Sequence, residues 1–486
     1  MEENDNEVVA NGIDGSTGGY LLPPMRDAEV AEVAANQPPE KEEMNLLRAI
    51  AGVASNPHFG ALFDVDLTKL EDAGWAIVFH VNEDPAIKAA LQPLIEHRQK
   101  QIADGNLVKI MEYREGETVP QWLARYGMGV GDIDPTRVPF YILLVGSPSK
   151  IPFLFGHLLD AVYGVGRICF DAQEQYAAYA NSVIAYETAG RAPTTRDVYF
   201  FGPRHVADKP TKLSSTSLVE PLAVGATQRP SVLERLAKSK FNLSYIGHYL
   251  DPDASRKETL HNIFRGSSDG RAQCLLFTAS HGVGWPLGDA RQASAQGALL
   301  CQDFPGAGFG PVKPEHYFAA SDLPGDGHVH GLVCFHFACY GVGTPKEDRF
   351  THKDAEPPRQ IAPDAFFSQL PQALLAHPNG GALGVIGHVE RAWPNSITTA
   401  GAGIQLLPFV NALSFILIGN PLGYALKDFN ERYAALSTNL GAMLEKKGFG
   451  FDVPDSDLAS TWISRNDAEA YVLFGDPGVR IRMDLT

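Results

Sequence analysis

The chain has 486 residues, of which 44% are hydrophobic and 20% charged, and its formal net charge is −17 at pH 7. This length and composition predict two or three globular units with a large core. Nucleic acid is excluded as an expected partner, because affinity for phosphates comes mainly from Lys and Arg.

Residues 1–45 are rich in Asp, Glu, Asn, Gly and Pro and show little periodicity, so they are predicted to form a flexible acidic tail or a pro-segment. The same residues lack the basic and apolar regions of a secretory signal, and no apolar run is suited to crossing a bilayer. The five cysteines lie mostly in apolar runs, which is typical of a reducing compartment. A cytoplasmic location is therefore predicted.

Apolar and amphipathic runs alternate over residues 46–195, the first predicted unit. Strands are predicted over residues 75–81, 107–111 and 138–145, and helices over residues 85–101, 119–126 and 172–187. Strands separated by helices of this length indicate βαβ crossovers and a mostly parallel sheet that is covered on both faces.

The alternation resumes over residues 196–486, the second predicted unit. Its strands are predicted at DVYFFG from residue 197 and over residues 241–246, 274–278, 332–338 and 382–387, with helices over residues 232–238 and 257–264. The polar segment 208–230 is predicted to be a long surface loop. Both units therefore belong to the α/β class.

Two predicted strands of the second unit end in reactive side chains. The run CLLFTAS stops at His281, and the run GLVCFHFA stops at Cys339. Because ligands and catalytic groups gather at the carboxyl ends of parallel strands, neighbouring strands would bring this imidazole and this thiol together. A histidine beside a cysteine can accept the thiol proton and later protonate a leaving amine.

The same segment offers donors for an oxyanion. Gly282 lets the backbone approach a scissile carbonyl, so the N–H groups of Gly282 and Cys339 are the predicted oxyanion donors. Taken singly, a buried cysteine or a lone histidine is more often structural, and Cys274 and Cys334 are predicted to be core residues. The combination of Cys339 and His281 at matching strand ends favours catalysis.

The strings TASHGVGW and VCFHFACYG resemble the His-Gly and Ala-Cys motifs of caspase-like (clan CD) cysteine peptidases. Further segments resemble gingipains in the same order: YILLVGSPSKIP, LDAVYG, VGRICFD, the helix ending IAYE, GALGVIGHVERAW and AYVLFGDPGVRIR. The resemblance implies a bacterial cysteine endopeptidase with a caspase-like three-layer α/β/α sandwich. Residues 46–195 would form a first subdomain, and residues 196–486 a catalytic subdomain beside it.

The resemblance also implies a substrate pocket with Asp160 at its base and Trp393 in its wall. A carboxylate there would select Arg or Lys before the cut. Phe337 replaces a smaller residue of the family, and Glu390 is a second acid that could face the pocket. Asp160 and Glu390 could instead be solvated loop acids, and the sequence identifies no carboxylate partner for His281.

A long polar insert with several prolines follows the predicted nucleophile over residues 341–365. Loops of this length in a compact domain tend to be functional, and self-processing there is a hypothesis. The predicted reaction needs no metal and no organic cofactor. Its partners would be a protein or peptide substrate and a regulatory protein.

Two other classes of function remain open at this point. A catalytically silent caspase-like scaffold could use the same fold to bind partners. A nucleotide-dependent enzyme is disfavoured, because neither GxxxxGK[ST] nor GxGxxG follows a predicted strand.

Overall fold

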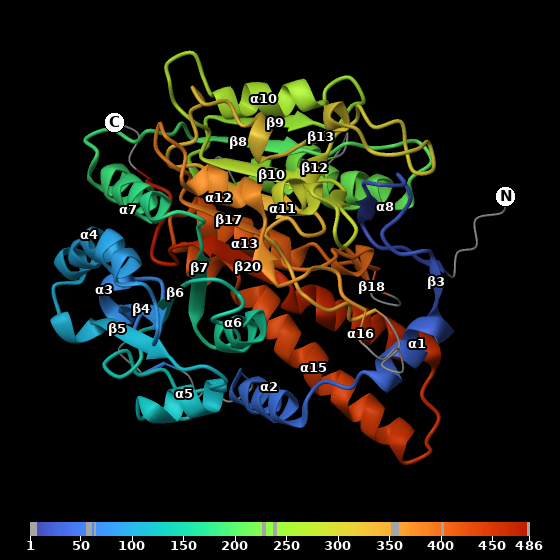
Figure 1. The fold of residues 1–486 in the computed structure, drawn as a ribbon, viewed down its shortest axis with the longest axis horizontal. Helices are drawn as coiled ribbons and strands as arrows, with labels where there is room; N and C mark the ends of the chain where they lie inside the picture. Colours follow the sequence, from blue (N-terminus) through green and yellow to red (C-terminus); the bar gives the residue numbers. More distant parts are fainter. Residues whose placement is uncertain are drawn as a thin grey trace.

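The computed structural model describes residues 7–54, 61–62, 65–225, 230–236, 241–350, 359–399 and 403–483. The strands of its main sheet are β4 (Trp75–His80), β5 (Val108–Tyr113), β6 (Tyr141–Val145), β7 (Gly164–Ile168), β8 (Asp197–Phe201), β9 (Tyr245–Tyr249), β10 (Leu275–Ala279), β14 (Val333–Phe337), β17 (Gly384–His388) and β20 (Tyr471–Gly475). They form one continuous sheet in the order β5-β4-β6-β7-β20-β17-β14-β10-β8-β9 (Figure 1).

The short strands that bear on the site are β1 (Glu7–Val8), β2 (Gly12–Asp14), β3 (Met25–Arg26), β11 (Gly282–Gly284), β12 (Ala298–Leu300), β13 (Tyr317–Phe318) and β16 (Phe366–Phe367). The α-helices are α1 (Asp27–Asn36), α2 (Lys41–Ala54), α3 (Leu70–Ala73), α4 (Pro85–Ile102), α5 (Val119–Arg125), α6 (Phe153–Asp160), α7 (Gln173–Thr188), α8 (Lys209–Leu213), α9 (Val232–Leu236), α10 (Lys257–Arg265), α11 (Arg291–Ala295), α12 (Gln369–Leu375), α13 (Leu407–Leu417), α14 (Leu422–Ala425), α15 (Lys427–Gly448) and α16 (Asp455–Glu469).

The central strands are covered on both faces, which confirms the α/β class. Every residue of β4, β6, β7, β10, β14, β17 and β20 is buried. On one face, Phe335 of β14 packs against Phe409 of α13. On the other face, Phe474 of β20 packs against Phe170 and Phe367. Strands that are buried along their whole length in this way are typical of sheets enclosed between two layers.

The sheet is mostly parallel, and its two halves run in opposite directions. Strand β20 pairs parallel with β7 but antiparallel with β17. The amino edge of β7 therefore lies on the same side as the carboxyl ends of β10 and β14. Strands β4 to β7 lie at one end of this sheet and β8 to β10, β14 and β17 at the other, with β20 between them. The division into two units with a boundary near residue 195 stays a prediction.

The N-terminal region is built into the fold, so the expected flexible tail does not describe residues 7–45. Helix α1 lies beside α16 (Figure 1) and packs against it through side chains that include Val30 and Val33. Strand β1 pairs with β3. Apolar residues at helical spacing give α1 one apolar face, which packs into the core. The acidic composition of the whole segment gave no indication of this face. The alternative of a pro-segment stays a prediction.

The polar stretch after β8 is also a correction. Residues 209–224 form α8 and a following π-helix (Ser214–Val224) instead of a surface loop. Asp208 begins α8, because its carboxylate accepts the backbone N–H of Thr211 at 3.0 Å. Buried Leu218 and Leu222 anchor the second helix.

An ion cluster in the core joins helices α4 and α7 to the segment after β20. Arg98 of α4 is fully buried and contacts Glu187 of α7 and Asp476 after β20, each at 2.7 Å. Burial opposes ionisation of Glu187, but the charge of Arg98 and hydrogen bonds from His97 and Arg98 lower the pKa of this carboxyl to about 2. The cluster therefore stabilises the fold most where the Glu187 carboxyl is ionised.

Arg98→Met is expected to lower the free energy of unfolding by about 3–5 kcal/mol at pH 7, because it leaves two carboxylates buried without their cation. Since the folded pKa of Glu187 lies below its unfolded value, the stabilisation is present above about pH 4.3 and is lost as the pH falls toward 2. Urea unfolding should therefore give a smaller difference at pH 3 than at pH 7. Exposed Lys100→Met on the same helix is the control, and an equal cost for both variants would contradict the prediction.

Candidate functional site

The side chains of His281 and Cys339 follow two neighbouring strands. Strands β10 and β14 pair in parallel with Ala279 opposite Phe337, so each reactive residue lies two positions beyond a matched pair. A Cβ atom on Gly282 would lie only 1.8 Å from the carbonyl oxygen of Cys339. Glycine is therefore required at position 282, because only a residue without a side chain can approach the backbone of Cys339 this closely.

The residue after Cys339, the predicted nucleophile, has an unusual backbone conformation. Tyr340 has φ = 56°, which a bulky residue rarely adopts. Its N–H donates to the carbonyl of Glu390 at 2.8 Å, and its carbonyl accepts the Ser368 hydroxyl at 2.6 Å. These contacts hold the turn that presents Cys339, as is common for strained residues at functional sites.

His281 has a carboxylate partner that the sequence did not reveal. Its Nε2 lies 2.8 Å from Oδ2 of Asp208, and both side chains are buried. Burial opposes ionisation of Asp208, but the charge of His281 and hydrogen bonds from His281, Thr211 and Tyr20 hold the pKa of this carboxyl well below its usual range. Within the described residues, Nδ1 of His281 is buried without a hydrogen-bond partner. One ring nitrogen is thus fixed by a carboxylate, while the other is left free for proton transfer.

The sulfur of Cys339 lies in a closed pocket of backbone atoms. The N–H of Ala392 donates to Sγ at 3.1 Å, and Sγ lies 2.6 Å from the carbonyl oxygen of Asn11. Burial raises the pKa of the Cys339 thiol to about 12, and the hydrogen bond from Ala392 only partly offsets this. In this arrangement the sulfur is a protonated thiol at neutral pH.

The N-terminal segment runs through this site. Strand β2 pairs in parallel with β11, placing Gly12 opposite Gly282. Farther along the segment, the Tyr20 hydroxyl donates to Oδ1 of Asp208 at 2.6 Å. Figure 1 shows this dark blue stretch beside α8, although the two segments lie far apart in the sequence.

Two predicted pocket residues flank the contact with Cys339. Glu390 and Trp393 lie on either side of the Arg391–Ala392 pair, after β17. The Glu390 carboxylate pairs with Arg391 at 3.0 Å, and Trp393 packs against Phe350 at a ring distance of 4.6 Å. Glu390 is buried, so the alternative that it is a solvated loop acid is wrong.

The other two predicted pocket residues have no contact with the thiol among their described partners. Asp160 ends α6, and its Oδ1 accepts the N–H of Val165 at 2.9 Å. Burial raises the pKa of this carboxyl to about 7, so it is not a solvated acid either. Asp160 lies on the same edge as Cys339 but three strands away, roughly 14 Å at the usual strand spacing. Phe337 packs against Phe409 and His388 in the core.

Comparisons with known proteins found similarity only among solved structures. No family model and no curated protein matches the chain. The Arg-specific cysteine proteinase gingipain R (RgpB) is 12% identical over 86% of this chain and 81% of its own, with a TM-score of 0.43. A structure described as that of a protease is 12% identical over 84% of this chain and 78% of its own, with a TM-score of 0.48. The complex of the Porphyromonas gingivalis RgpB pro- and mature domains is 13% identical over 85% of this chain and 81% of its own, with a TM-score of 0.43.

Similarities of this size leave the chemistry to be derived from the side chains of this chain. The sequence missed Asp208 and Asn11 as members of the site. Asp208 lies 73 positions before His281 and carried only the signal of a helix start, Asp-Lys-Pro-Thr. Asn11 carried no signal, because its role depends on where the N-terminal segment lies.

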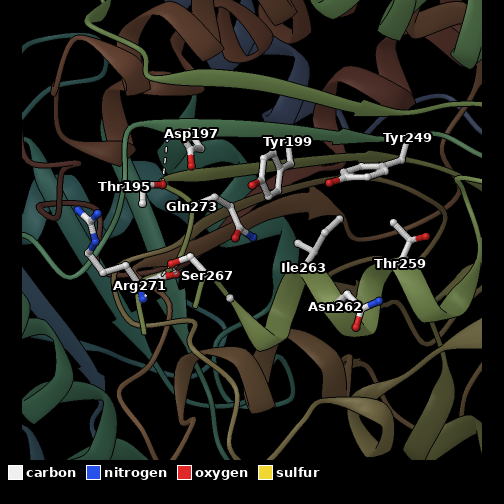
Figure 2. Close-up of a pocket in the computed structure, with 11 residues that line it drawn as sticks. Thr195, Asp197, Tyr199, Tyr249, Thr259, Asn262, Ile263, Ser267, Arg271 and Gln273 are labelled. Atoms are coloured by element: carbon white, nitrogen blue, oxygen red, sulfur yellow. Dashed lines mark hydrogen bonds between the residues drawn. The ribbon is translucent and has the colours of Figure 1, made fainter. Parts of the chain in front are cut away.

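A separate surface pocket lies at the outer edge of the sheet. It has a volume of about 320 Å³ and is lined by residues of β8, β9 and α10, including Asp197, Tyr199 and Tyr249 (Figure 2). None of its lining residues belongs to the site described above. In the described residues, no group of three or more His, Cys, Asp or Glu side chains could hold a metal ion, and no helix there is long and apolar enough to span a membrane.

Proposed function

We propose that this protein is a cysteine endopeptidase that uses Cys339 as nucleophile and His281 as general base, with Asp208 orienting the imidazole. The observation that carries the proposal is that His281 and Cys339 follow the neighbouring strands β10 and β14, and that the imidazole has a carboxylate on Nε2 and no hydrogen-bond partner on Nδ1 among the described residues. This arrangement matches the needs of acyl transfer through a thioester.

In the proposed reaction, His281 takes the thiol proton and the sulfur attacks the carbonyl carbon of the substrate peptide. The N–H groups of Gly282 and Cys339 are the proposed donors for the oxyanion that forms. His281 then protonates the leaving amine, and water hydrolyses the thioester to release the second product. Asp208 stays ionised throughout and stabilises the imidazolium that forms beside it.

Two finer features of the proposal come from the sequence resemblance. Cleavage after Arg or Lys would require that Asp160 reach the substrate side chain, although its carboxylate is engaged with Val165. Self-processing within the insert 341–365 is the second, and residues 351–358 of that insert lie outside the described residues. A silent scaffold is the competing function, and the buried thiol is the observation that favours it.

A panel of fluorogenic peptides and an electrophilic peptide probe separates these functions. We expect the probe to label Cys339, and we expect hydrolysis of at least one peptide class by the wild type. If Asp160 selects basic residues, Asp160→Ala should lower kcat/KM at least tenfold for Arg and Lys peptides only, because the charge-assisted contact is worth about that much. Absence of both labelling and hydrolysis would leave the scaffold as the better account.

A further inference from the structure

The backbone of Asn11 lies directly against Cys339, the proposed nucleophile. Its carbonyl oxygen contacts Sγ of Cys339, and its N–H donates to the carbonyl of Ala392 at 3.0 Å. The residues that follow run as strand β2 along β11, directly after His281. An extended chain that adds to the free edge of a strand, here the edge of β11 opposite β12, is how β-addition binds a peptide.

The side chain of Asn11 is enclosed by a site that selects a hydrogen-bond donor. Asn11 is 1% exposed, and its Nδ2 donates to the backbone carbonyl of Ser280 at 3.1 Å. A carboxylate at this position would face that carbonyl with another acceptor, and its charge would be buried. Sites that hydrogen-bond a substrate group strongly reject an analogue that lacks it. The contact therefore favours asparagine over aspartate.

Little room is left on the other side of the carbonyl. A Cβ atom on Gly12 would lie 2.9 Å from Sγ of Cys339 and 2.3 Å from a methyl group of Leu21. A small residue is thus favoured after the cut while the segment is in place. The sequence Asn11-Gly12 meets both demands.

Building on the proposed peptidase function, we propose that residues 10–14 are an internal substrate that blocks the active site, and that the enzyme cuts after asparagine instead of after Arg or Lys, first between Asn11 and Gly12. This assigns asparagine recognition to the subsite that contains the Ser280 carbonyl. It also gives the N-terminal segment the role of a pro-segment.

The cut follows the same chemistry as any other substrate. The sulfur of Cys339 bonds to the carbonyl carbon of Asn11, the Asn11–Gly12 C–N bond breaks, and His281 passes its proton to the Gly12 amine. Water then hydrolyses the thioester, leaving a carboxylate on Asn11 and regenerating the thiol. Burial raises the pKa of this thiol to about 12 in the blocked form. The first cut is therefore slow at neutral pH, which allows the uncut chain to persist.

The first arm of the test follows self-cleavage of the full-length chain. Wild type and Cys339→Ala are incubated side by side at pH 7 and pH 9, and new N-termini are identified by mass spectrometry. We expect a chain beginning at Gly12 in the wild type, faster at pH 9, and none in Cys339→Ala. Asn11→Ala should slow this cut at least a hundredfold.

The second arm measures whether the segment covers the sulfur. Asn11→Arg places a long charged side chain in an enclosed site and should expel the segment, raising the rate of Cys339 alkylation by iodoacetamide at least tenfold. Asn36→Arg, at the exposed end of α1, is the matched control and should leave the rate unchanged. Peptides ending in Asn, Asp, Arg or Lys, tested on Asn11→Arg, then report the preference of the freed site.

The outcomes separate the two proposals. If peptides are hydrolysed but no Gly12 N-terminus forms, the internal-substrate proposal is wrong and the peptidase proposal stands. The internal-substrate proposal is also wrong, and the peptidase proposal stands, if Asn11→Arg slows the alkylation of Cys339 and Arg peptides are hydrolysed faster than Asn peptides. If no variant hydrolyses any peptide and Cys339 never reacts with the probe, the peptidase proposal fails and this inference fails with it.

Discussion

Replacing Cys339 with Ala, or His281 with Gln, is expected to lower kcat/KM for peptide substrates by about 10⁴-fold or more. The first change removes the atom that would form the thioester, and the second removes the base that takes the thiol proton. Because these groups act as a unit, the double variant should be little worse than either single variant. Simple addition of the two effects would predict a far greater loss.

Purified variants should be compared with fluorogenic peptides under identical conditions, after unfolding curves have shown that each is folded. Cys169→Ala, which alters a half-buried thiol outside the site, and His248→Gln, which alters an exposed ring on β9, are the matched controls. Both controls should keep near wild-type activity. Full activity in either site variant would overturn the assignment of the nucleophile or the base.

Asp208→Asn is expected to lower kcat by about 10²–10³-fold with little change in KM. The carboxylate accepts from Nε2 of His281, so it fixes the ring and stabilises the charge that forms on proton transfer. An amide can present an oxygen to the ring, but it carries no charge. Since the wild-type pKa of Asp208 lies well below its usual range, its protonation should not limit activity at pH 5 or above.

A purely structural role for Asp208 makes a different prediction. If Asp208 acted only as the cap of α8, Asp208→Asn should leave kcat, KM and the melting temperature nearly unchanged, because asparagine caps a helix about as well as aspartate. Thr211→Val is the matched variant, because it removes a hydroxyl that contacts the same carboxylate and leaves the charge in place. We expect it to reduce kcat far less than Asp208→Asn. Equal effects of the two variants would support the structural role.

The positions of His281 and Cys339 could be predicted because the relevant signals are local. Each residue directly ends an apolar run of strand length, and parallel strands gather their carboxyl ends at one edge. The α/β class followed from the same alternation, and the ten-stranded sheet confirms it. The close backbone approach at Gly282 was also predictable, since this glycine follows His281 at a strand end. Its role as an oxyanion donor stays a prediction.

The predicted pocket residues Asp160, Glu390 and Trp393 lie on other elements than the predicted nucleophile, so their positions depend on how those elements pack together. Trp393 and Glu390 lie beside Ala392, which contacts Cys339. Asp160 is separated from β14 by two intervening strands, so its access to a substrate depends on side-chain reach and not on the motif that suggested it.

The sequence by itself determined which residues end the strands, because hydrophobic periodicity and turn residues act over a few positions. Only the tertiary structure decided which carboxylate meets His281 and which segment covers Cys339. Asp208 and Asn11 are brought to the site by the packing of α8 and β2, elements that lie far from the strand ends in the chain. Such contacts depend on the free energy of packing the whole chain, which no local pattern records.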